Sequence, residues 1–348
     1  MMLREPPSPK GASSVTVIGA GVAGSWQALL FACAGYDVTL LDRDDIRMTY
    51  ATSHWAGGML APWCEGEVSE PLITHLGTRS LELWRQHLPG TSFNGSLVVA
   101  QPRDRSDFER FAGVTTGHDR LDAEEVGQLE PALHGRFHAG LFFAGEGHVE
   151  PRAVLPQLHA RFVAAGGIIR FESECDLDEL ALETGGIVID CRGLAARDKF
   201  SDLRGVKGEM AVVEVQDFKL SRPVRLLHPR WPIYVIPRED GCFMIGATSI
   251  ESEDTAVSVR SLLELLTAAY VLHPAFGDAY ILEVGAGLRP AFPDHLPRIV
   301  VTRKKISVNG LYRHGFLLAP ALAEMTLAYV QRGFIHNEVM RSSFEVMS

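Results

Sequence analysis

The feature that most constrains this chain is a glycine-rich turn near its N-terminus. Residues 14–18 form a short β-branched run, typical of a buried parallel strand, and the sequence GAGVAG (residues 19–24) follows at once. Residues 25–33 are mostly apolar and predict a helix, and residues 37–41 predict a second strand. Strand, glycine turn, helix and strand in this order predict a βαβ unit of a Rossmann-type, dinucleotide-binding fold.

Each glycine of this turn has a physical role in holding a pyrophosphate. Gly19 permits the tight turn, Gly21 lets the backbone approach the phosphates, and Gly24 allows the helix to pack closely on the strand. The helix N-terminus adds unpaired N–H groups. Asp42 follows the second strand, where its carboxylate can accept hydrogen bonds from both ribose hydroxyls and would repel a 2′-phosphate. The unit therefore predicts FAD or NAD rather than NADP, and it does not distinguish the first two.

Composition excludes several partners. Lys and Arg number 33 against 43 Asp and Glu, a net charge of −10, so neither nucleic acid nor an anionic membrane is expected to be the main partner. The five cysteines are scattered without zinc-ligand spacing, which predicts no metal site and a reducing, cytoplasmic location. Prolines at positions 6, 7 and 9 argue against a signal peptide, so residues 1–13 are expected to be a flexible tail.

The 348 residues correspond to about two domains. Strand-like segments at residues 96–101, 141–144, 210–215, 234–238 and 242–250 predict an antiparallel sheet, with a hairpin at Asp240-Gly241 and helices near 121–133 and 257–272. The α/β pattern returns between and after these segments. We therefore predict an α/β fold with a discontinuous dinucleotide-binding domain (residues 14–75, 146–204 and 285–340) and an α+β substrate-binding domain (residues 76–145 and 205–284).

Motifs along most of the chain resemble those of the D-amino-acid oxidase family of FAD-dependent amine oxidases, in its glycine oxidase (ThiO-type) branch. They occur in the expected order from about residue 14 to about residue 331. They are GAGVAG (19–24), LLDR (40–43), AGGMLAP (56–62), VEP (149–151), GVKGEM (205–210), YVIPR (234–238), GATS (246–249), AGLRP (286–290) and YRHGFLLAPA (312–321). The resemblance implies that the first domain binds FAD.

The resemblance also implies individual contacts with FAD. Besides the three glycines, these are expected at Val22, Ala23, Asp42, Arg43, Thr52, Ser53, Gly57, Gly58, Met59, Leu311, Tyr312, Arg313, His314, Gly315, Phe316 and Leu317, with a further backbone contact near Cys175 or Asp176. Related sarcosine oxidases attach FAD covalently through a cysteine in the segment that corresponds to residues 285–294. This chain has no cysteine there, so noncovalent FAD is expected.

For the substrate, the resemblance implies a carboxylate held beside the flavin. Arg289 matches the family's carboxylate-binding arginine, and the planar fork of an arginine suits that task. Tyr234 and Arg313 match a second and a third pocket residue. Ser249 stands where the glycine oxidase pattern has methionine, so a wider pocket that also accepts small D-amino acids or N-methylglycine is expected. Neither His54 nor His314 is needed as a base if the substrate amine is already neutral.

The expected activity is oxidative deamination of glycine or another small amino acid or amine. The product is an imine, which hydrolyses to a 2-oxo acid and ammonia, with O₂ reduced to hydrogen peroxide. In the ThiO branch that imine serves the thiazole branch of thiamine biosynthesis. Two alternatives stay open: a D-amino-acid or sarcosine dehydrogenase that passes electrons to another acceptor, and an NAD-binding sensor module without turnover. Homo-oligomerisation is compatible with each of them.

Overall fold

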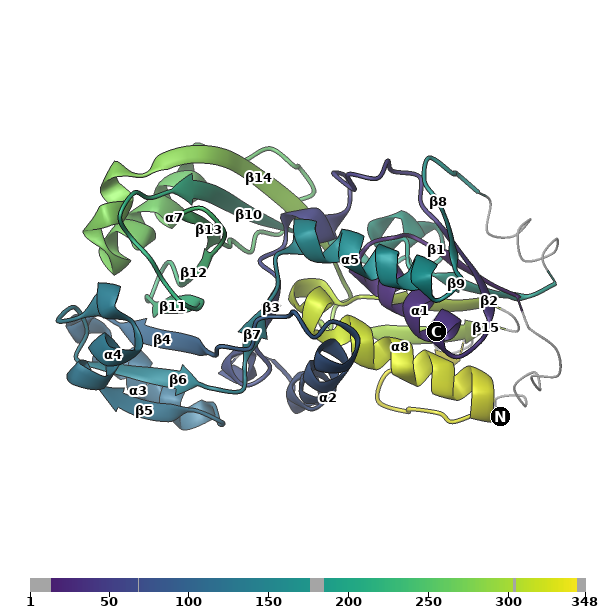
Figure 1. The fold of residues 1–348 in the computed structure, drawn as a ribbon, viewed down its shortest axis with the longest axis horizontal. Coiled ribbons are helices and arrows are strands. Elements are labelled where there is room, and N and C mark those ends of the chain that lie inside the picture. Colours follow the sequence, from purple (N-terminus) through teal and green to yellow (C-terminus); the bar gives the residue numbers. More distant parts are fainter. Residues whose placement is uncertain (1–13, 68, 176–184, 303–304, 343–348) are drawn as a thin grey trace.

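The computed structural model describes residues 14–67, 69–175, 185–302 and 305–342. Two large sheets lie toward opposite ends of an elongated molecule, and a two-stranded sheet of β3 (Met59–Leu60) and β7 (Gly147–His148) lies between them (Figure 1). The expected tail, residues 1–13, and Asp176 lie outside the described residues.

The glycine-rich turn belongs to a seven-stranded sheet. Its order is β17 (Met340–Ser342), β15 (Arg298–Thr302), β16 (Lys305–Asn309), β9 (Ile187–Asp190), β1 (Ser14–Ile18), β2 (Asp37–Leu41) and β8 (Ile168–Arg170). The strands from β16 to β8 pair in parallel, and only β15 with β16 pairs antiparallel. The central strand β1 is buried from Val15 onward, which explains its β-branched, apolar sequence.

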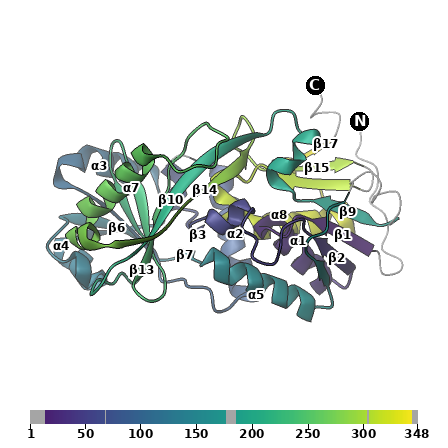
Figure 2. The same cartoon turned by 90° about the horizontal axis from the view of Figure 1, so that it is seen from above.

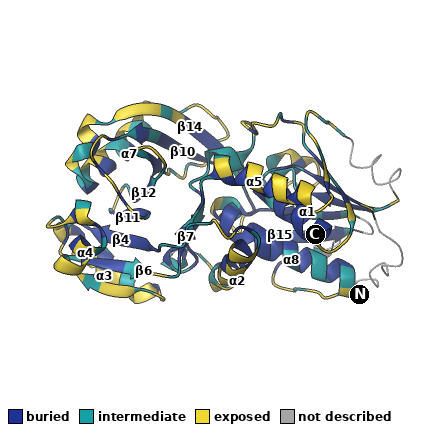
Figure 3. Ribbon diagram, in the orientation of Figure 1, coloured by how far each residue is buried: buried dark blue, intermediate teal, exposed yellow. Residues whose placement is uncertain are grey.

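Helices cover this sheet and form the largest apolar core. α1 (Val22–Cys33) packs against both α5 (Pro151–Ala164) and α8 (Gly315–Arg332), and α2 (Pro71–His87) packs against α8. Figure 3 shows that the strands are buried while the outer faces of the helices are exposed. α8 ends where Gly333 adopts a left-handed conformation, φ 70°, which glycine accepts without strain. In the described part of the chain, no helix combines the length and apolar character needed to cross a membrane.

The second sheet has eight strands and is mostly antiparallel. Its order is β14 (Tyr280–Ala291), β10 (Arg204–Glu214), β13 (Cys242–Gly246), β12 (Ile233–Pro237), β11 (Val224–Leu227), β4 (Ser96–Ala100), β6 (Ala139–Phe143) and β5 (Asp119–Asp122). α7 (Val259–Leu272) packs on β10, β12 and β13, whereas α3 (Arg105–Val114) and α4 (Ala123–Leu129) pack on β4 and β6 (Figure 2). Asp240 and Gly241 both have positive φ in the hairpin between β12 and β13, as predicted.

The predicted fold class is confirmed, since one sheet is largely parallel and the other largely antiparallel. The domain boundaries remain a prediction, and the one at residue 285 falls inside β14. The helix expected near residues 121–133 is present but shorter: Asp122 and Glu125 form a capping box that starts α4 at residue 123, and Pro131 begins a separate 3₁₀ turn.

β14 was missed because its glycines and Pro290 argue against a strand. The structure explains these glycines by close packing. A Cβ at Gly285 would lie 2.0 Å from the ring of Trp55, so the indole packs on bare backbone. Tertiary contact therefore decides the conformation of this segment, against its local sequence preference.

Candidate active site

A cavity of about 1090 Å³ runs from the glycine-rich turn to the eight-stranded sheet. Most of the predicted site residues line it, although they come from segments that are far apart in the sequence. The predicted residues on its wall are Gly19, Gly21, Val22, Ala23, Asp42, Arg43, Thr52, Ser53, Gly57, Gly58, Met59, Cys175, Tyr234, Arg289, Leu311, Tyr312, Arg313, Gly315 and Phe316. The fold therefore brings the predicted cofactor and substrate residues to one continuous space.

The glycine turn has the geometry that the sequence pattern predicts. Gly19 has φ +97°, and a Cβ there would lie 2.5 Å from the carbonyl oxygen of Cys191, directly after the neighbouring strand β9. A Cβ at Gly24 would lie 1.8 Å from the carbonyl oxygen of Gly19. Both contacts are with backbone, which cannot move aside as a side chain can. The turn thus depends on the absence of side chains at these positions.

The groups around the turn fit the diphosphate and ribose of a dinucleotide. Gly21 precedes α1 and offers no side chain to cap it, and the N–H of Val22 donates to Ser53 Oγ at 3.1 Å on the cavity wall. Asp42 lies at the end of β2, as predicted. Its Oδ2 accepts from the N–H of Ala20 at 2.5 Å and its Oδ1 from the N–H of Asp44 at 2.8 Å. These bonds fix the carboxylate beside the turn, where ribose hydroxyls can reach it.

The small-residue segment at 56–59 and the turn before it are held by the residue after β7 and by the eight-stranded sheet. Gly58 has φ +72°, and a Cβ there would lie 2.1 Å from the carbonyl oxygen of Val149. Arg238 Nη2 donates to the carbonyl oxygen of Gly57 at 2.8 Å, and Thr52 Oγ1 donates to that of Leu288 on β14 at 2.7 Å. The backbone of this segment therefore forms a fixed wall of the cavity.

Arg289 projects from β14 and lies over the neighbouring strand β10. A Cβ at Gly208 on β10 would lie 2.1 Å from Arg289 Nη2, so the guanidinium rests on bare backbone. Its Nη1 donates to the carbonyl oxygen of Thr248 at 2.9 Å. Burial, and then the positive charge of Arg313, lower the pKa of Arg289 to about 10, so the side chain stays charged at neutral pH. Arg289 is a fixed cation on the cavity wall.

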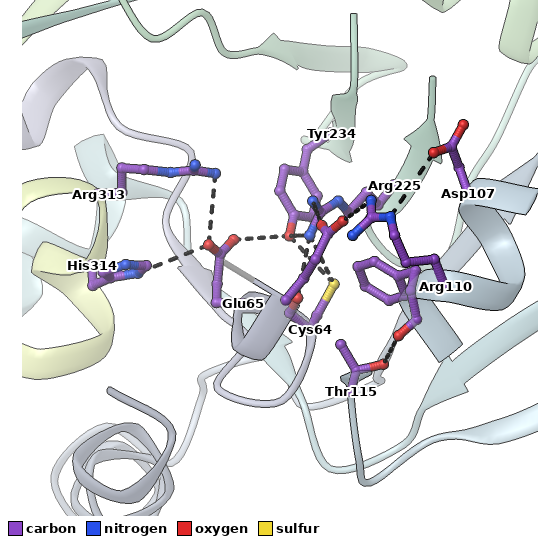
Figure 4. Close-up of polar contacts among 11 residues, drawn as sticks. Cys64, Glu65, Asp107, Arg110, Thr115, Arg225, Tyr234, Arg313 and His314 are labelled. Atoms are coloured by element: carbon purple, nitrogen blue, oxygen red, sulfur yellow. Dashed lines mark hydrogen bonds and ion pairs between the residues drawn. The ribbon is translucent and has the colours of Figure 1, made fainter. Parts of the chain in front are cut away.

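A second group of polar side chains surrounds Glu65, in the 3₁₀ turn Cys64–Glu67. Glu65 Oε1 accepts from the Tyr234 hydroxyl at 2.9 Å, and Oε2 lies 3.6 Å from Arg313 Nη2 and 4.0 Å from His314 Nδ1. Figure 4 shows Glu65 between Arg313 and His314 on one side and Tyr234 on the other. Three segments distant in sequence thus meet at one carboxylate.

The charge states of this group follow from burial and neighbours. Burial alone would raise the pKa of Glu65, but Arg313 and the Tyr234 hydroxyl, among others, outweigh it and lower that pKa to about 2. Burial lowers the pKa of His314 to about 4 and raises that of the Cys64 thiol to about 12. At neutral pH Glu65 is therefore an anion and Arg313 a cation, while His314, Cys64 and Tyr234 are neutral.

Glu146 supports the turn that carries Glu65. Its side chain is fully buried, and Oε1 accepts from the N–H groups of Trp63 at 3.0 Å and Cys64 at 2.7 Å. The Ser96 hydroxyl bonds to Oε2. Burial raises the pKa of Glu146 to about 8 despite these bonds. Glu146 is thus a buried positioning group for the turn.

Four predicted site residues are not on the cavity wall. Gly24 lies within α1 against Gly19, His314 is buried with Nε2 3.1 Å from Ser69 Oγ, and Leu317 packs over Gly77. Ser249 is exposed, with Oγ 3.0 Å from the Tyr312 hydroxyl. Their roles stay predictions. Glu65 lines the cavity and was missed, although two glutamates in the sequence CEGE directly after the small-residue segment were a visible signal.

Known proteins resemble this chain over most of its length. A Rhizobium etli protein named as a thiamine biosynthesis oxidoreductase, ThiO, is 47% identical over 316 residues, 89% of this chain and 94% of that protein. Glycine oxidase from Pseudomonas putida is 25% identical over 89% of this chain and 92% of its own. The crystal structure of glycine oxidase from Geobacillus kaustophilus superposes with a TM-score of 0.76 at 24% identity, covering 91% of this chain and 95% of that one, and so shares the fold.

The model of one protein family matches residues 14–329, and that family is described as FAD dependent oxidoreductase, DAO. The match spans every segment that lines the cavity and, apart from β17, every strand of the two large sheets. Together with the relative at 47% identity, it establishes that this chain belongs to the DAO family of FAD-dependent oxidoreductases.

Proposed function

We propose that this enzyme oxidises glycine, or another small amino acid or amine, to the imine. The imine then hydrolyses, so that glycine, O₂ and water give glyoxylate, ammonia and hydrogen peroxide. The observation that carries the proposal is the shared cavity: Arg289 and Arg313 line the same space as the glycine-rich turn. A cation beside a flavin site is what a small carboxylate substrate needs.

The chain's own residues bind and orient the substrate. Arg289 is held by Thr248 and by the bare backbone at Gly208, so its guanidinium is preorganised to receive a carboxylate. Bound FAD supplies the hydride acceptor and the route for the electrons to dioxygen. Nearby His314 is neutral and buried, so the proposal assigns it no proton transfer and requires the substrate to react with its amine neutral.

The names of two relatives favour a small substrate. One is named as a thiamine biosynthesis oxidoreductase and the other as glycine oxidase. We therefore place the proposed imine product in the thiazole branch of thiamine biosynthesis. We propose that FAD is bound noncovalently. Related sarcosine oxidases attach it through a cysteine in the segment that corresponds to residues 285–294, and this chain has no cysteine there. Acid precipitation of the purified protein should release the flavin into the supernatant.

The test is a peroxide assay on the flavin-loaded protein. Glycine, sarcosine and small D- and L-amino acids are supplied under air, and hydrogen peroxide and ammonia are measured. Peroxide from glycine or sarcosine supports the proposal. Flavin reduction by these substrates without peroxide would instead indicate a dehydrogenase with another electron acceptor. If none of these substrates reduces the flavin, the proposed function is refuted.

A further inference from the structure

The substrate end of the cavity contains two guanidinium groups and one buried carboxylate. Arg289 and Arg313 both line the cavity, and Glu65 Oε2 faces Arg313 Nη2 at 3.6 Å. Glu65 is only 7% exposed, and its Oε2 atom makes no hydrogen bond within the described residues. About a third of the Arg313 side chain is exposed. Glu65 therefore lies behind Arg313 and compensates its charge.

The neighbouring ion pairs use another carboxylate, although the positive charge of the buried Arg225 also helps to lower the pKa of Glu65. Glu67, two residues later, pairs with Arg225 at 2.7 Å and with Arg110 at 2.7 Å. Figure 4 shows Arg225 and Arg110 on the far side of Tyr234 from Arg313. The low pKa of Glu65 and the charged state of both arginines leave the substrate end with one net positive charge, which one carboxylate neutralises.

We propose that Glu65 sets the specificity of this pocket for substrates with a single carboxylate, because it neutralises Arg313 and leaves Arg289 as the cation of this trio without a carboxylate partner among the described residues. The inference rests on the proposed function and narrows its substrate class. Glycine and N-methylglycine fit such a pocket. Iminodiacetate and D-aspartate carry a second carboxylate, which would have to displace Glu65 from Arg313.

The displacement is unfavourable because Glu65 is buried. Taking away Arg313 as its partner would leave a largely buried, ionised carboxylate without the nearest of its compensating cations. Glu65 acts here through Arg313, as a positioning residue. It touches neither the substrate nor the reacting atoms. Loss of its charge should therefore change which ligand the pocket prefers more than how tightly it holds a monocarboxylate.

The experiment uses ligands that cannot be oxidised, so it does not depend on turnover. Methoxyacetate has the shape of N-methylglycine, and diglycolate has the shape of iminodiacetate. Each is titrated into the flavin-loaded protein, and binding is followed by the visible absorbance of the flavin. The wild type is compared with Glu65→Gln, which still accepts from Tyr234, and with Glu70→Gln. Glu70 is exposed, and its substitution removes the same charge from the chain five residues away, at a side chain that forms no described ion pair with Arg313.

We expect Glu65→Gln to shift the ratio of the two dissociation constants toward diglycolate by about tenfold or more, as for one added net charge in a partly dry pocket. Glu70→Gln should leave the ratio unchanged. The double variant Glu65→Gln with Arg313→Gln restores one net charge and should restore the wild-type ratio. A general loss of pocket structure would weaken both ligands and would not produce this pattern.

An unchanged ratio in Glu65→Gln overturns the inference, and so does a double variant that keeps a raised preference for diglycolate. If Glu65→Gln does not load with flavin, the double variant decides alone: a wild-type ratio supports the inference, and a change of about tenfold in either direction overturns it. Failure of the peroxide assay would refute the proposed function, while this titration would still report the charge preference of the pocket.

Discussion

The two ends of the cavity are built in different ways. At the glycine-rich turn the wall is backbone: a Cβ added at Gly19, or at Gly24 behind it, would meet backbone atoms, and bonds from Ala20 and Asp44 hold Asp42. At the other end the wall is charged side chains. Glu65, Tyr234, Arg289 and Arg313 come from four separated segments and meet only in the folded protein.

This contrast separates two kinds of requirement. A backbone cradle requires positions without side chains, because a single added methyl group would clash with backbone atoms that cannot move aside. A cluster of side chains needs charges balanced, and its members can be exchanged in pairs if the balance is kept. The first end should therefore respond to substitution by losing the cofactor or the fold, and the second by changes in substrate affinity and pH dependence.

The largest effect is expected at the cradle. Gly24→Ala places a Cβ 1.8 Å from the carbonyl oxygen of Gly19, so α1 must move away from β1. We expect a loss of about 3 kcal/mol or more in stability together with most of the bound flavin. Thermal unfolding and the ratio of flavin to protein absorbance measure both. Gly113→Ala on α3 is the control, since its Cβ would meet nothing within 4 Å. Normal flavin content in Gly24→Ala would show that the cradle is less rigid than its geometry implies.

At the opposite end, Arg289→Ala should keep FAD and lose substrate binding. Removing one charge-assisted pair predicts a loss of about 2–4 kcal/mol in kcat/KM for glycine, mainly through a higher KM. Steady-state kinetics and the flavin spectrum test this. Arg260→Ala is the matched control, because Arg260 is exposed on α7, away from the cavity. Unchanged kinetics in Arg289→Ala would remove Arg289 from the substrate site.

A smaller effect, on the pH dependence of stability, is expected from Glu146, which supports the turn that carries Glu65. The pKa of Glu146 is about 8 in the fold, against an ordinary value of 4.5, so unfolding at neutral pH releases a proton. Stability should then fall as pH rises from about 6.5 to 8, by about 2 kcal/mol. His148 and His314, whose pKa values are about 4, change the pH dependence of stability only below this pH window. Unfolding measured at several pH values gives the slope.

Glu146→Gln should flatten this slope. Its amide oxygen still accepts from Trp63 and Cys64, and its amide nitrogen can donate to Ser96, so the turn is retained. The two slopes of unfolding free energy against pH are compared, because the contributions of the other titrating groups are the same in variant and wild type and cancel in the difference. An identical slope in both proteins would mean that Glu146 is ionised in the fold, and the turn would then owe its position to other contacts.

Sequence reasoning predicted the parallel half of the molecule well because its signals are local. β1 and β2 have the predicted bounds, and the glycine pattern required no knowledge of distant residues. β14 was missed because its glycines are explained only by the Trp55 ring that packs on them. Its local sequence disfavours a strand, and a neighbour more than two hundred residues away decides the outcome.

The candidate site divides in the same way. Arg289 and Tyr234 were predicted from family motifs, and both line the cavity. Glu65 was missed because nothing in the sequence places it beside Arg313, nearly 250 positions later, or buries it so that its charge persists. Charge balance between distant segments is a property of the folded chain, so it is available only from the structure.

The bare position at Gly208 has a consequence for how this pocket can change over evolutionary time. The guanidinium of Arg289 occupies the volume that a side chain at position 208 would fill, so substitutions at the two positions depend on each other. A lineage can abandon the arginine and then acquire a side chain at 208, but the reverse order passes through a variant with a displaced cation. The order of change is therefore constrained in both directions, because the arginine must be lost before a side chain appears at position 208, and glycine must return there before the arginine can.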